Sequence, residues 1–481
     1  MIQIADIETN LESGFLMKFL PPERPVDLYN EGFGSSDILG RKKTSKALTN
    51  LLERINDPLV LALNGEWGTG KSYFLKRWVG AHTIENNSSS TVVYFDAFAN
   101  DYLSDPLPAL VSALSERVPS QKKVLIGNVM NAAIKLAKPL TRIGLAVATT
   151  GMSEAAGAIS STAINAVGGE SATAIEAFWK KETGRRTAME EFQKALMALA
   201  EPKYTDKTGS TLVFVIDELD RCRPDYALEV LEVIKHCFSV PHVHSVLGVN
   251  ISALENSVVA RYGENIDAKS YLKKFIQVTL ELPSTIGDAH NRKQTSLEYL
   301  AHLIKEMGIP EHIAEPLKSR LQLVLAVNNI SLREIGQIVS SLTLANSDVL
   351  TNVNTYYGWI ELLIDLVIVK IAFPEMFGRF LNANVTQKDL ETYIGATSTT
   401  CRQRIEGERN NDYSHAIDYA FSSWKFITGN PRLSLDDNEE TRPWDGANFS
   451  RFGSMYDEDN RNLPQTVHSL WLDYFSFYQT Q

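Results

Sequence analysis

Continuous apolar runs alternate with helical patterns in the first part of the chain. The runs are 58–63, 91–95, 211–216 and 243–249, and a fifth segment, 271–280, changes from a helical to a strand pattern. Short apolar runs bounded by turn-forming residues are typical of strands buried on both faces of a parallel sheet. Strands that alternate with helices predict an α/β fold.

The pattern changes to purely helical spacing from Asn291 onward. The segment 359–373 is the most apolar of these helices, but it carries Glu361 and Asp365, so we interpret it as a buried helix that ends at Pro374. The segment 469–478 is aromatic. We expect it to dock on its own domain, and contact with a partner is the alternative.

The segment 122–182 is unusually rich in alanine, glycine, serine, threonine and isoleucine. A membrane-spanning helix needs about 20 strongly apolar residues, whereas here the apolar residues are small and charges such as Lys138, Arg142 and Glu154 interrupt them. We therefore predict small-residue helices that pack on each other or on a partner. Membrane contact stays open as the less favoured alternative.

Together these patterns predict a core with a helical insertion and a helical C-terminal region. Pro21, Pro22 and Pro25 break the mixed N-terminal sequence, which favours an extended arm there. The predicted parts are an arm over 1–30, an α/β core over 31–121 and 183–285, the insertion over 122–182, a helical subdomain over 286–385, and a helical and loop region with the aromatic tail over 386–481.

Composition narrows the classes of protein that the chain can belong to. Its 481 residues are 44% hydrophobic and 22% charged, which is typical of a folded protein. The net charge of -11 and the pI near 5.4 disfavour constitutive binding to nucleic acid, although a local basic patch keeps that question open. Three scattered cysteines and an N-terminus without a secretion signal predict a reducing, cytoplasmic location, with peripheral contact to the inner membrane as an alternative.

The sequence Gly65-Glu66-Trp67-Gly68-Thr69-Gly70-Lys71-Ser72 lies between the apolar run 58–63 and a helical pattern. Glycines allow the backbone N–H groups to surround an anion, and the following helix N-terminus adds positive charge. We expect Lys71 to reach the β- and γ-phosphates of a nucleotide and Ser72 to bind Mg²⁺. The predicted nucleotide contacts are Gly65, Glu66, Trp67, Gly68, Thr69, Gly70, Lys71, Ser72 and Tyr73, and the alternative is an ordinary glycine turn.

A turn and a helix precede the first strand of the core, and they provide candidates for contact with the base. The turn contains Ile38, Leu39 and Arg41, which we predict to lie on the base side of the nucleotide. An ordinary helix N-terminus explains the same residues equally well.

Polar residues follow two of the apolar runs. Asp217 and Glu218 end the run 211–216, at the edge where parallel sheets hold their ligands. We predict that Asp217 holds Mg²⁺ and that Glu218 is the general base for an attacking water. Asn250 ends the run 243–249 and is the candidate sensor of that water or of the γ-phosphate. The alternative is that these strands simply end in polar residues.

Several stretches together resemble the KAP family of P-loop NTPases. The loop with its tryptophan is similar to the phosphate loop of that family, and 216–222 is similar to its Walker B segment. Weaker likenesses occur at 95–98, where Asp96 and Phe98 replace the family's asparagine and tryptophan, at 105–107 and at 373–375. The resemblance covers roughly residues 30–385.

The resemblance implies a P-loop NTPase core of the additional-strand class that binds ATP and Mg²⁺. It also implies a large insertion between the Walker A and Walker B motifs, where 122–182 lies. Arg221 directly follows the acidic segment and is a candidate arginine finger, and Arg333 falls in the region that supplies a second sensor in the wider class. Bacterial members of the family are often linked to mobile elements and phage exclusion.

We therefore expect a slow, Mg²⁺-dependent ATPase that acts as a nucleotide-dependent switch or assembly component, with anti-phage defence as its setting. Its expected partners are ATP and either further copies of the chain or effector proteins. The alternatives are a nucleotide-gated scaffold with negligible turnover and, less favoured, a nucleic-acid motor.

Overall fold

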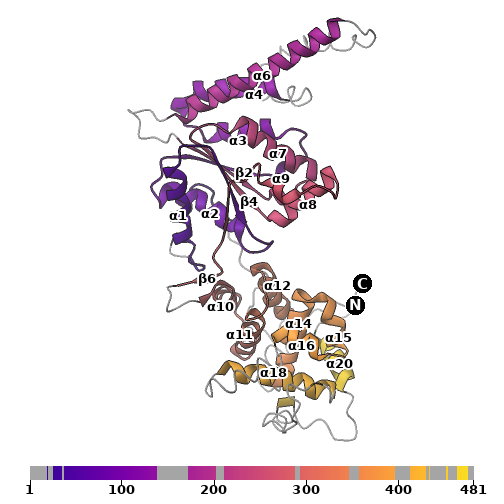
Figure 1. The fold of residues 1–481 in the computed structure, drawn as a ribbon. Helices are drawn as coiled ribbons and strands as arrows, with labels where there is room; N and C mark the ends of the chain where they lie inside the picture. The colour runs from indigo at the N-terminus through magenta and orange to yellow at the C-terminus, as the bar shows by residue number, and fades with distance from the viewer. Residues whose placement is uncertain are drawn as a thin grey trace, which may run out of the picture. The chain divides into compact units, whose positions relative to one another are not determined.

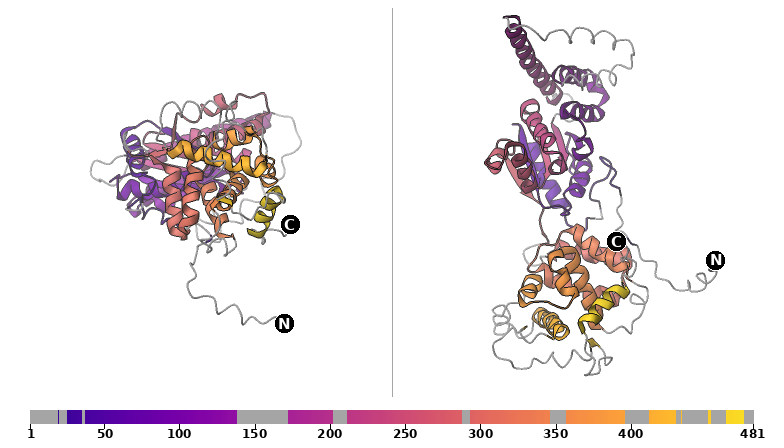
Figure 2. Two further views of the ribbon diagram at one scale, coloured as in Figure 1. Left: turned by 90° about the horizontal axis from the view of Figure 1, so that it is seen from below. Right: turned by 90° about the vertical axis from the view of Figure 1, so that its right-hand side faces the viewer.

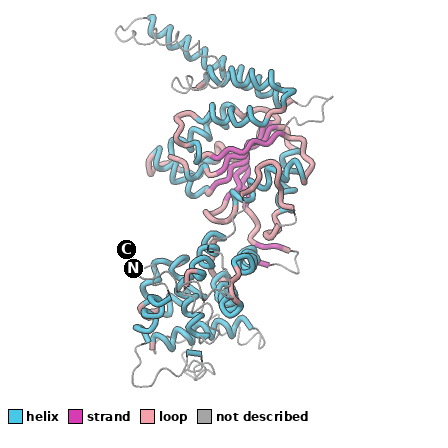
Figure 3. Tube along the Cα trace, turned by 180° about the vertical axis from the view of Figure 1, so that it is seen from behind, coloured by secondary structure: helices cyan, strands magenta, loops and turns pink. Residues whose placement is uncertain are grey.

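The computed structural model describes residues 19, 25–34, 37–137, 172–201, 211–287, 293–345, 357–395, 412–429, 433, 451–452 and 463–474. These residues fall into two compact units, one within Pro25–Leu282 and the other within Met1–Arg24 and Pro283–Gln481. Figures 1 and 3 show that the first unit contains the large sheet and that the second is built mainly from helices.

The first unit is built on a five-stranded sheet with the order β2-β3-β4-β1-β5, and all its paired strands are parallel. The strands are β1 (Leu59–Asn64), β2 (Thr91–Asp96), β3 (Leu212–Asp217), β4 (Val243–Val249) and β5 (Val278–Glu281). The strand β4 separates β1 from β3, so the phosphate loop and the acidic pair follow strands that are not neighbours. The predicted additional-strand arrangement of a P-loop NTPase is confirmed.

Helices cover both faces of this sheet, which explains why β3 and β4 are buried at every position. On one face, α1 (Lys42–Arg54) and α2 (Lys71–Ile84) pack Leu48, Leu52 and Trp78 against strand residues. The other face is covered by α3 (Pro106–Arg117), α7 (Pro224–Cys237), α8 (Ile251–Tyr262) and the short α9 (Ala268–Leu272). Figure 1 and the right-hand view of Figure 2 show these layers.

The predicted insertion is helical in the parts that the structure describes. The helices α4 (Lys123–Leu136) and α6 (Ala172–Ala200) pack together, and Val129 and Ala133 of α4 share a core cluster with Phe192 and Leu196 of α6. These two residues of α6 lie beyond residue 182, and the boundary of the insertion there stays a prediction. Residues 138–171 lie outside the described residues. Among the helices that are described, none combines the length and the apolar composition needed to cross a membrane.

The second unit begins with the short antiparallel pair β6 (Thr285–Ile286) and β7 (Lys293–Gln294). Its described helices are α10 (Thr295–Met307), α11 (Glu311–Leu325), α12 (Leu332–Thr343), α14 (Tyr357–Ala372), α15 (Pro374–Leu381), α16 (Gln387–Ile394), α18 (Asp412–Thr428) and α20 (Leu463–Tyr474). One core cluster runs from Leu300 to Trp471 and therefore crosses residue 385. The division of this region at that residue stays a prediction.

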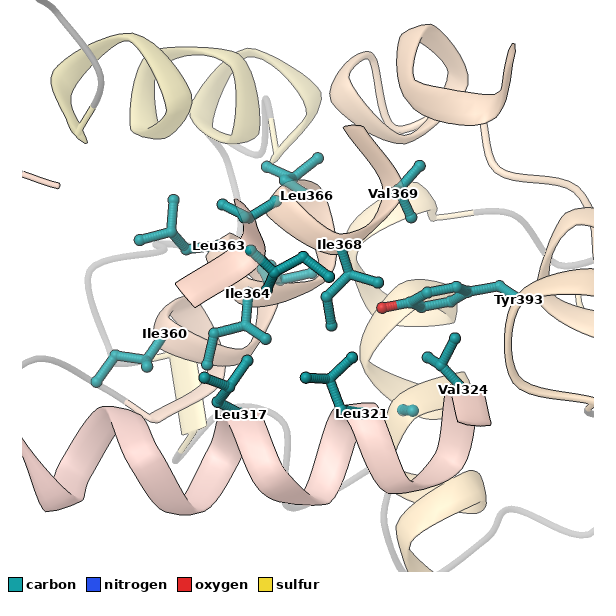
Figure 4. Packing of buried hydrophobic residues seen from close by; sticks show 14 of the residues in the cluster. Leu317, Leu321, Val324, Ile360, Leu363, Ile364, Leu366, Ile368, Val369 and Tyr393 are labelled. Carbon is teal, nitrogen blue, oxygen red and sulfur yellow. The ribbon is translucent and has the colours of Figure 1, made fainter. Parts of the chain in front are cut away.

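The helix α14 is the centre of this core, and Figure 4 shows its apolar side chains against Leu317 and Leu321 of α11. Its charged residues are paired in the interior, since Arg320 lies 3.1 Å from Glu361 and 3.3 Å from Asp365. The carboxylate of Asp365 also accepts hydrogen bonds from Tyr393 and Trp424. A buried helix can carry these charges because each has a partner.

The aromatic C-terminal segment is described as far as residue 474. Its Trp471 is buried, its ring lies 5.1 Å from the ring of Phe377, and the Lys370 ammonium is 4.9 Å from the Trp471 ring. In the described part, the tail therefore packs on its own unit. Residues 475–481 lie outside the described residues.

A buried histidine on α2 makes the stability of the first unit depend on pH. His82 bonds Thr49 through Nδ1 at 2.9 Å and Ser88 through Nε2 at 2.8 Å, and its side chain is fully buried. Burial lowers the pKa of His82 from 6.5 to about 4, although the nearby Glu53 carboxylate acts in the opposite direction. The folded protein therefore keeps the imidazole neutral at pH values where the unfolded chain already binds a proton.

We expect stability to be lost as pH falls below 6.5, because the unfolded chain then binds the proton more readily than the folded protein does. At pH 5 the loss attributable to His82 should be about 2 kcal/mol. Urea unfolding of the wild type and of His82→Gln at pH 7.5 and pH 5 measures it. Equal losses of stability in the two proteins would contradict this assignment.

Candidate nucleotide-binding site

The predicted phosphate loop connects β1 to α2 and curls around the N-terminus of that helix. Gly68 and Gly70 have φ angles of 84° and 87°, in the left-handed region that glycine adopts without strain. The N–H of Gly65 donates to the carbonyl of Val249 at 3.2 Å, and the Thr69 hydroxyl donates to the carbonyl of Glu66 at 2.8 Å. The loop is thus fixed at its start and closed across its middle, with the positive end of α2 behind it.

Lys71 is the first residue of α2, and its ammonium lies over the loop. The Nζ atom donates to the carbonyl oxygens of Gly65 and Glu66 at 2.5 and 2.9 Å, and the residue is only 8% exposed. A lysine held by backbone carbonyls at the helix N-terminus concentrates positive charge within the loop. This arrangement favours a polyanion such as a triphosphate.

Asp217 and Ser72 meet although they lie far apart in the sequence. The Ser72 side chain is hydrogen-bonded to the buried Asp217 carboxylate, which also accepts hydrogen bonds from the Tyr94 hydroxyl at 2.8 Å and from the Glu218 N–H at 3.0 Å. The structure therefore brings the phosphate loop and the acidic segment together.

The oxygens of Ser72 and Asp217 suit Mg²⁺, which prefers hard oxygen ligands. Burial raises the pKa of Asp217, while hydrogen bonds from Tyr94, Ser72 and Glu218 act against that shift. A nearby cation would stabilise the ionised carboxylate further. The chemistry of these residues therefore fits the predicted metal.

Tyr94 belongs to β2 and was not among the predicted site residues. Burial first, and then the charge of Asp217, raise the pKa of its hydroxyl, so it stays protonated as a hydrogen-bond donor. A hydroxyl within the apolar run 91–95 was the available signal, but the sequence does not show that β2 pairs with β3.

Gly248 leaves the space that the Asp217 carboxylate fills. A Cβ at position 248 would lie 2.5 Å from Oδ1 of Asp217 and 2.5 Å from Cδ1 of Leu75. We expect Gly248→Ala to displace the carboxylate and to raise the Mg²⁺ concentration needed for nucleotide binding by about tenfold. Nucleotide titrations over a range of Mg²⁺ concentrations measure this change.

The matched control for this substitution is Gly127→Ala on α4, where an added Cβ has no heavy atom within 4 Å. It should leave the Mg²⁺ dependence unchanged. An unchanged Mg²⁺ dependence in Gly248→Ala would contradict the metal assignment of Asp217.

Glu218 follows Asp217 in a left-handed conformation, with φ 59° and ψ 26°. Such a conformation costs about 1 kcal/mol or more for a residue with a side chain, so its surroundings must hold it. Its carboxylate lies 2.7 Å from Nη1 of Arg221. Burial raises the pKa of Glu218, and Arg221 acts in the opposite direction. The predicted general base and the predicted arginine finger are therefore paired within one chain.

A second link joins the phosphate loop to the acidic segment. The indole Nε1 of Trp67 donates to Oδ2 of Asp220 at 2.6 Å. Trp67 was a predicted nucleotide contact, but Asp220 was not a predicted site residue. The acidic cluster 217–220 was the available signal, although the sequence does not show which of its carboxylates faces the loop.

Asn250 lies at the end of β4, next to the start of the loop. Its Oδ1 accepts a hydrogen bond from the Ala253 N–H at 3.4 Å, so the side chain caps α8. The neighbouring Val249 carbonyl binds the Gly65 N–H. The residue thus lies at the correct edge of the sheet, and its role as a sensor stays a prediction.

The predicted base-side residues lie just before α1. The carboxylate of Asp37 accepts hydrogen bonds from the N–H groups of Arg41 and Lys42, both at 2.8 Å. Arg41 is buried, and this burial lowers its pKa to about 10 against the attraction of Asp37. Ile38 is partly exposed and Leu39 half-buried. Contact of Ile38, Leu39 and Arg41 with the base stays a prediction.

Two further predicted residues, Tyr73 and Arg333, belong to different units. The Tyr73 ring is half-exposed on the first turn of α2, 5.3 Å from the Arg77 guanidinium. Arg333 belongs to the first turn of α12, in the second unit, where Ser331 and Glu334 form a capping box. The roles of Tyr73 and Arg333 at the nucleotide stay predictions.

The parallel sheet, the glycine-wrapped loop and the carboxylate beside it define a P-loop NTPase, a nucleotide-binding protein. The family model described as "KAP family P-loop domain" matches residues 41–349. The chain belongs to this family.

Solved structures similar to this chain include two of the Aeropyrum pernix ORC2 protein. The ADP form has 12% identity and a TM-score of 0.33, with 85% of each chain covered. The structure described as ADPNP-ADP complexes has 11% identity and a TM-score of 0.33, with 96% of this chain and 97% of that chain covered. No curated protein matches the sequence.

Proposed function

We propose that the chain binds ATP with Mg²⁺ and hydrolyses it slowly, as a nucleotide-dependent switch or assembly component. The observation that carries this proposal is the contact between Ser72 of the loop and Asp217 of the acidic segment, next to the general-base candidate Glu218. Ser72 follows β1 and Asp217 ends β3, two strands that are not neighbours, and their convergence at one helix N-terminus is what phosphoryl transfer to water requires.

In the proposed reaction, water attacks the γ-phosphate in line with the leaving group. Glu218 orients the water and accepts its proton, while Lys71 and Arg221 stabilise the charge that develops on the phosphate oxygens. Ser72 and Asp217 would hold Mg²⁺, which when bound would supply positive charge to the triphosphate. The Arg221 guanidinium has further N–H donors besides the Nη1 that faces Glu218, so one side chain can serve both groups.

The switch or assembly role is tested by measuring phosphate release and particle mass on the same purified chain with Mg²⁺ and either ATP or ADP. We expect slow phosphate release and a larger particle with ATP, because a neighbouring subunit or effector would recognise the γ-phosphate state. The same mass with both nucleotides would contradict the assembly role. Infection of cells that carry the intact or a loop-substituted chain would test the anti-phage setting.

A second candidate function is a nucleotide-gated scaffold that holds ATP with negligible turnover. The ion pair between Arg221 and Glu218 favours it, because a carboxylate paired with a guanidinium is a weaker base. Tight ATP binding without phosphate release would support the scaffold. Adding duplex DNA or anionic liposomes to the same assay tests the nucleic-acid motor and peripheral contact with the inner membrane.

A further inference from the structure

The hydrogen bond between Trp67 and Asp220 joins two groups with very different surroundings. The Trp67 residue is 51% exposed, so burial alone does not fix its ring, whereas Asp220 is only 8% exposed. Their 2.6 Å bond involves a carboxylate and is therefore of the stronger, charge-assisted kind. A glycine-rich loop has few side chains that can anchor it to the rest of the protein. The large side chain of Trp67 is one of them.

Asp220 belongs to the short 3-10 turn η4 (Leu219–Arg221), directly after Glu218. Leu219 is completely buried, and the turn packs against β4 and α8. The Arg221 N–H donates to the carbonyl of Glu218 at 3.1 Å. One side of the turn is therefore held by the core and the other by the phosphate loop through Trp67.

The placement of Glu218 relative to the loop depends on this turn. The strands β1 and β3, which lead into the two segments, are separated by β4, so no ladder of hydrogen bonds joins them directly. Direct links between the segments come from Ser72 to Asp217 and from Trp67 to Asp220. The left-handed backbone of Glu218 lies between the two acidic residues and needs support from both sides.

We propose that Asp220 is a positioning residue for hydrolysis. Through its hydrogen bond with Trp67 it fixes turn η4 to the phosphate loop and so sets the position of the Glu218 carboxylate relative to the γ-phosphate. This inference rests on the proposed function, because it concerns the orientation of the general base. A loss of this hydrogen bond should therefore slow the chemical step and leave nucleotide affinity nearly unchanged.

The test compares kcat and KM for phosphate release, and the Kd for ATP, in four variants. Trp67→Phe keeps an aromatic ring but removes the donor, and Asp220→Ala removes the acceptor. Asp220→Asn keeps an acceptor oxygen, and the double variant Trp67→Phe/Asp220→Ala tests whether the two residues act as a pair.

Trp67→Phe and Asp220→Ala should each lower kcat by about tenfold, as expected where a hydrogen bond to a charged group is lost. The Kd should stay within about twofold of the wild type, because the phosphate-binding backbone N–H groups, that of residue 67 included, and Lys71 are unchanged. Asp220→Asn should recover most of the activity. The double variant should be no slower than the slower single variant, since both remove the same bond.

The matched control is Asp225→Ala, which removes an exposed carboxylate from the first turn of α7. It should behave as the wild type. Trp67→Phe alters a half-exposed ring, so it tests the inference even where Asp220→Ala does not fold.

A wild-type kcat in Trp67→Phe would overturn the inference. A raised KM with unchanged kcat would do the same, because the tryptophan would then serve nucleotide binding alone. Multiplicative effects in the double variant would show two independent roles and would also overturn it. An intact protein that binds ATP but releases no phosphate would instead overturn the proposed hydrolysis, and the inference with it.

Discussion

Replacing Lys71 with methionine is expected to reduce phosphate release by about a hundredfold or more and to weaken ATP binding. Methionine keeps most of the buried apolar stem, so the change removes the ammonium with little loss of packing. That ammonium lies 2.5 and 2.9 Å from the carbonyls of Gly65 and Glu66, within the loop that is proposed to bind the triphosphate. Phosphate-release kinetics and ATP titration measure the two effects.

The control for this prediction is Lys46→Met, which removes an exposed ammonium from α1 in the same unit. It should retain the wild-type rate and affinity. If Lys71→Met hydrolyses ATP as the wild type does, the loop does not bind the reacting phosphates and the proposed site is wrong. Thermal unfolding of both variants separates a loss of function from a loss of fold.

The sequence predicts those parts of the site whose geometry is local. Gly68 and Gly70 need a left-handed backbone, which glycine supplies, and the loop connects a strand to a helix as expected. Asp217 ends a buried strand, and the ends of parallel strands share one edge of the sheet. The position of Ser72 and Asp217 at one edge of the sheet could therefore be predicted without knowing the strand order, whereas their direct contact depends on that order.

Contacts that depend on strand order or on side-chain direction could not be predicted. Tyr94 reaches Asp217 because β2 pairs with β3, and no local pattern specifies that pairing. The pairing of Arg221 with Glu218 depends on the left-handed backbone at Glu218, which is unusual for a residue with a side chain.

The second unit also contains contacts that could not be predicted from the sequence. The sequence predicts α14 as a buried helix that carries charges, but Arg320, a partner of both Glu361 and Asp365, comes from α11. Helix packing brings that partner into place. Hydrophobic periodicity therefore predicts which face of a helix is buried, whereas ion pairs between helices depend on tertiary structure.

Glu218→Gln is expected to bind ATP with nearly unchanged affinity. It should hydrolyse ATP at about one hundredth of the wild-type rate or even more slowly. Glutamine keeps the length and an acceptor oxygen but is far too weak a base to take a proton from water. Its uncharged amide also ends the ion pair with Arg221, which leaves the guanidinium with a single hydrogen bond at most to position 218. Single-turnover phosphate release, measured beside ATP binding, separates the chemical step from affinity.

The matched control is Glu232→Gln, which neutralises an exposed carboxylate on α7 and should keep the wild-type rate. A Glu218→Gln variant that turns over as fast as the wild type would remove Glu218 from the proposed mechanism. A faster variant would show that the pair with Arg221 restrains the site more than the carboxylate assists it. Retained ATP binding with lost turnover would instead distinguish the role of Glu218 from that of Lys71, because of these two residues only the lysine contributes to holding the triphosphate.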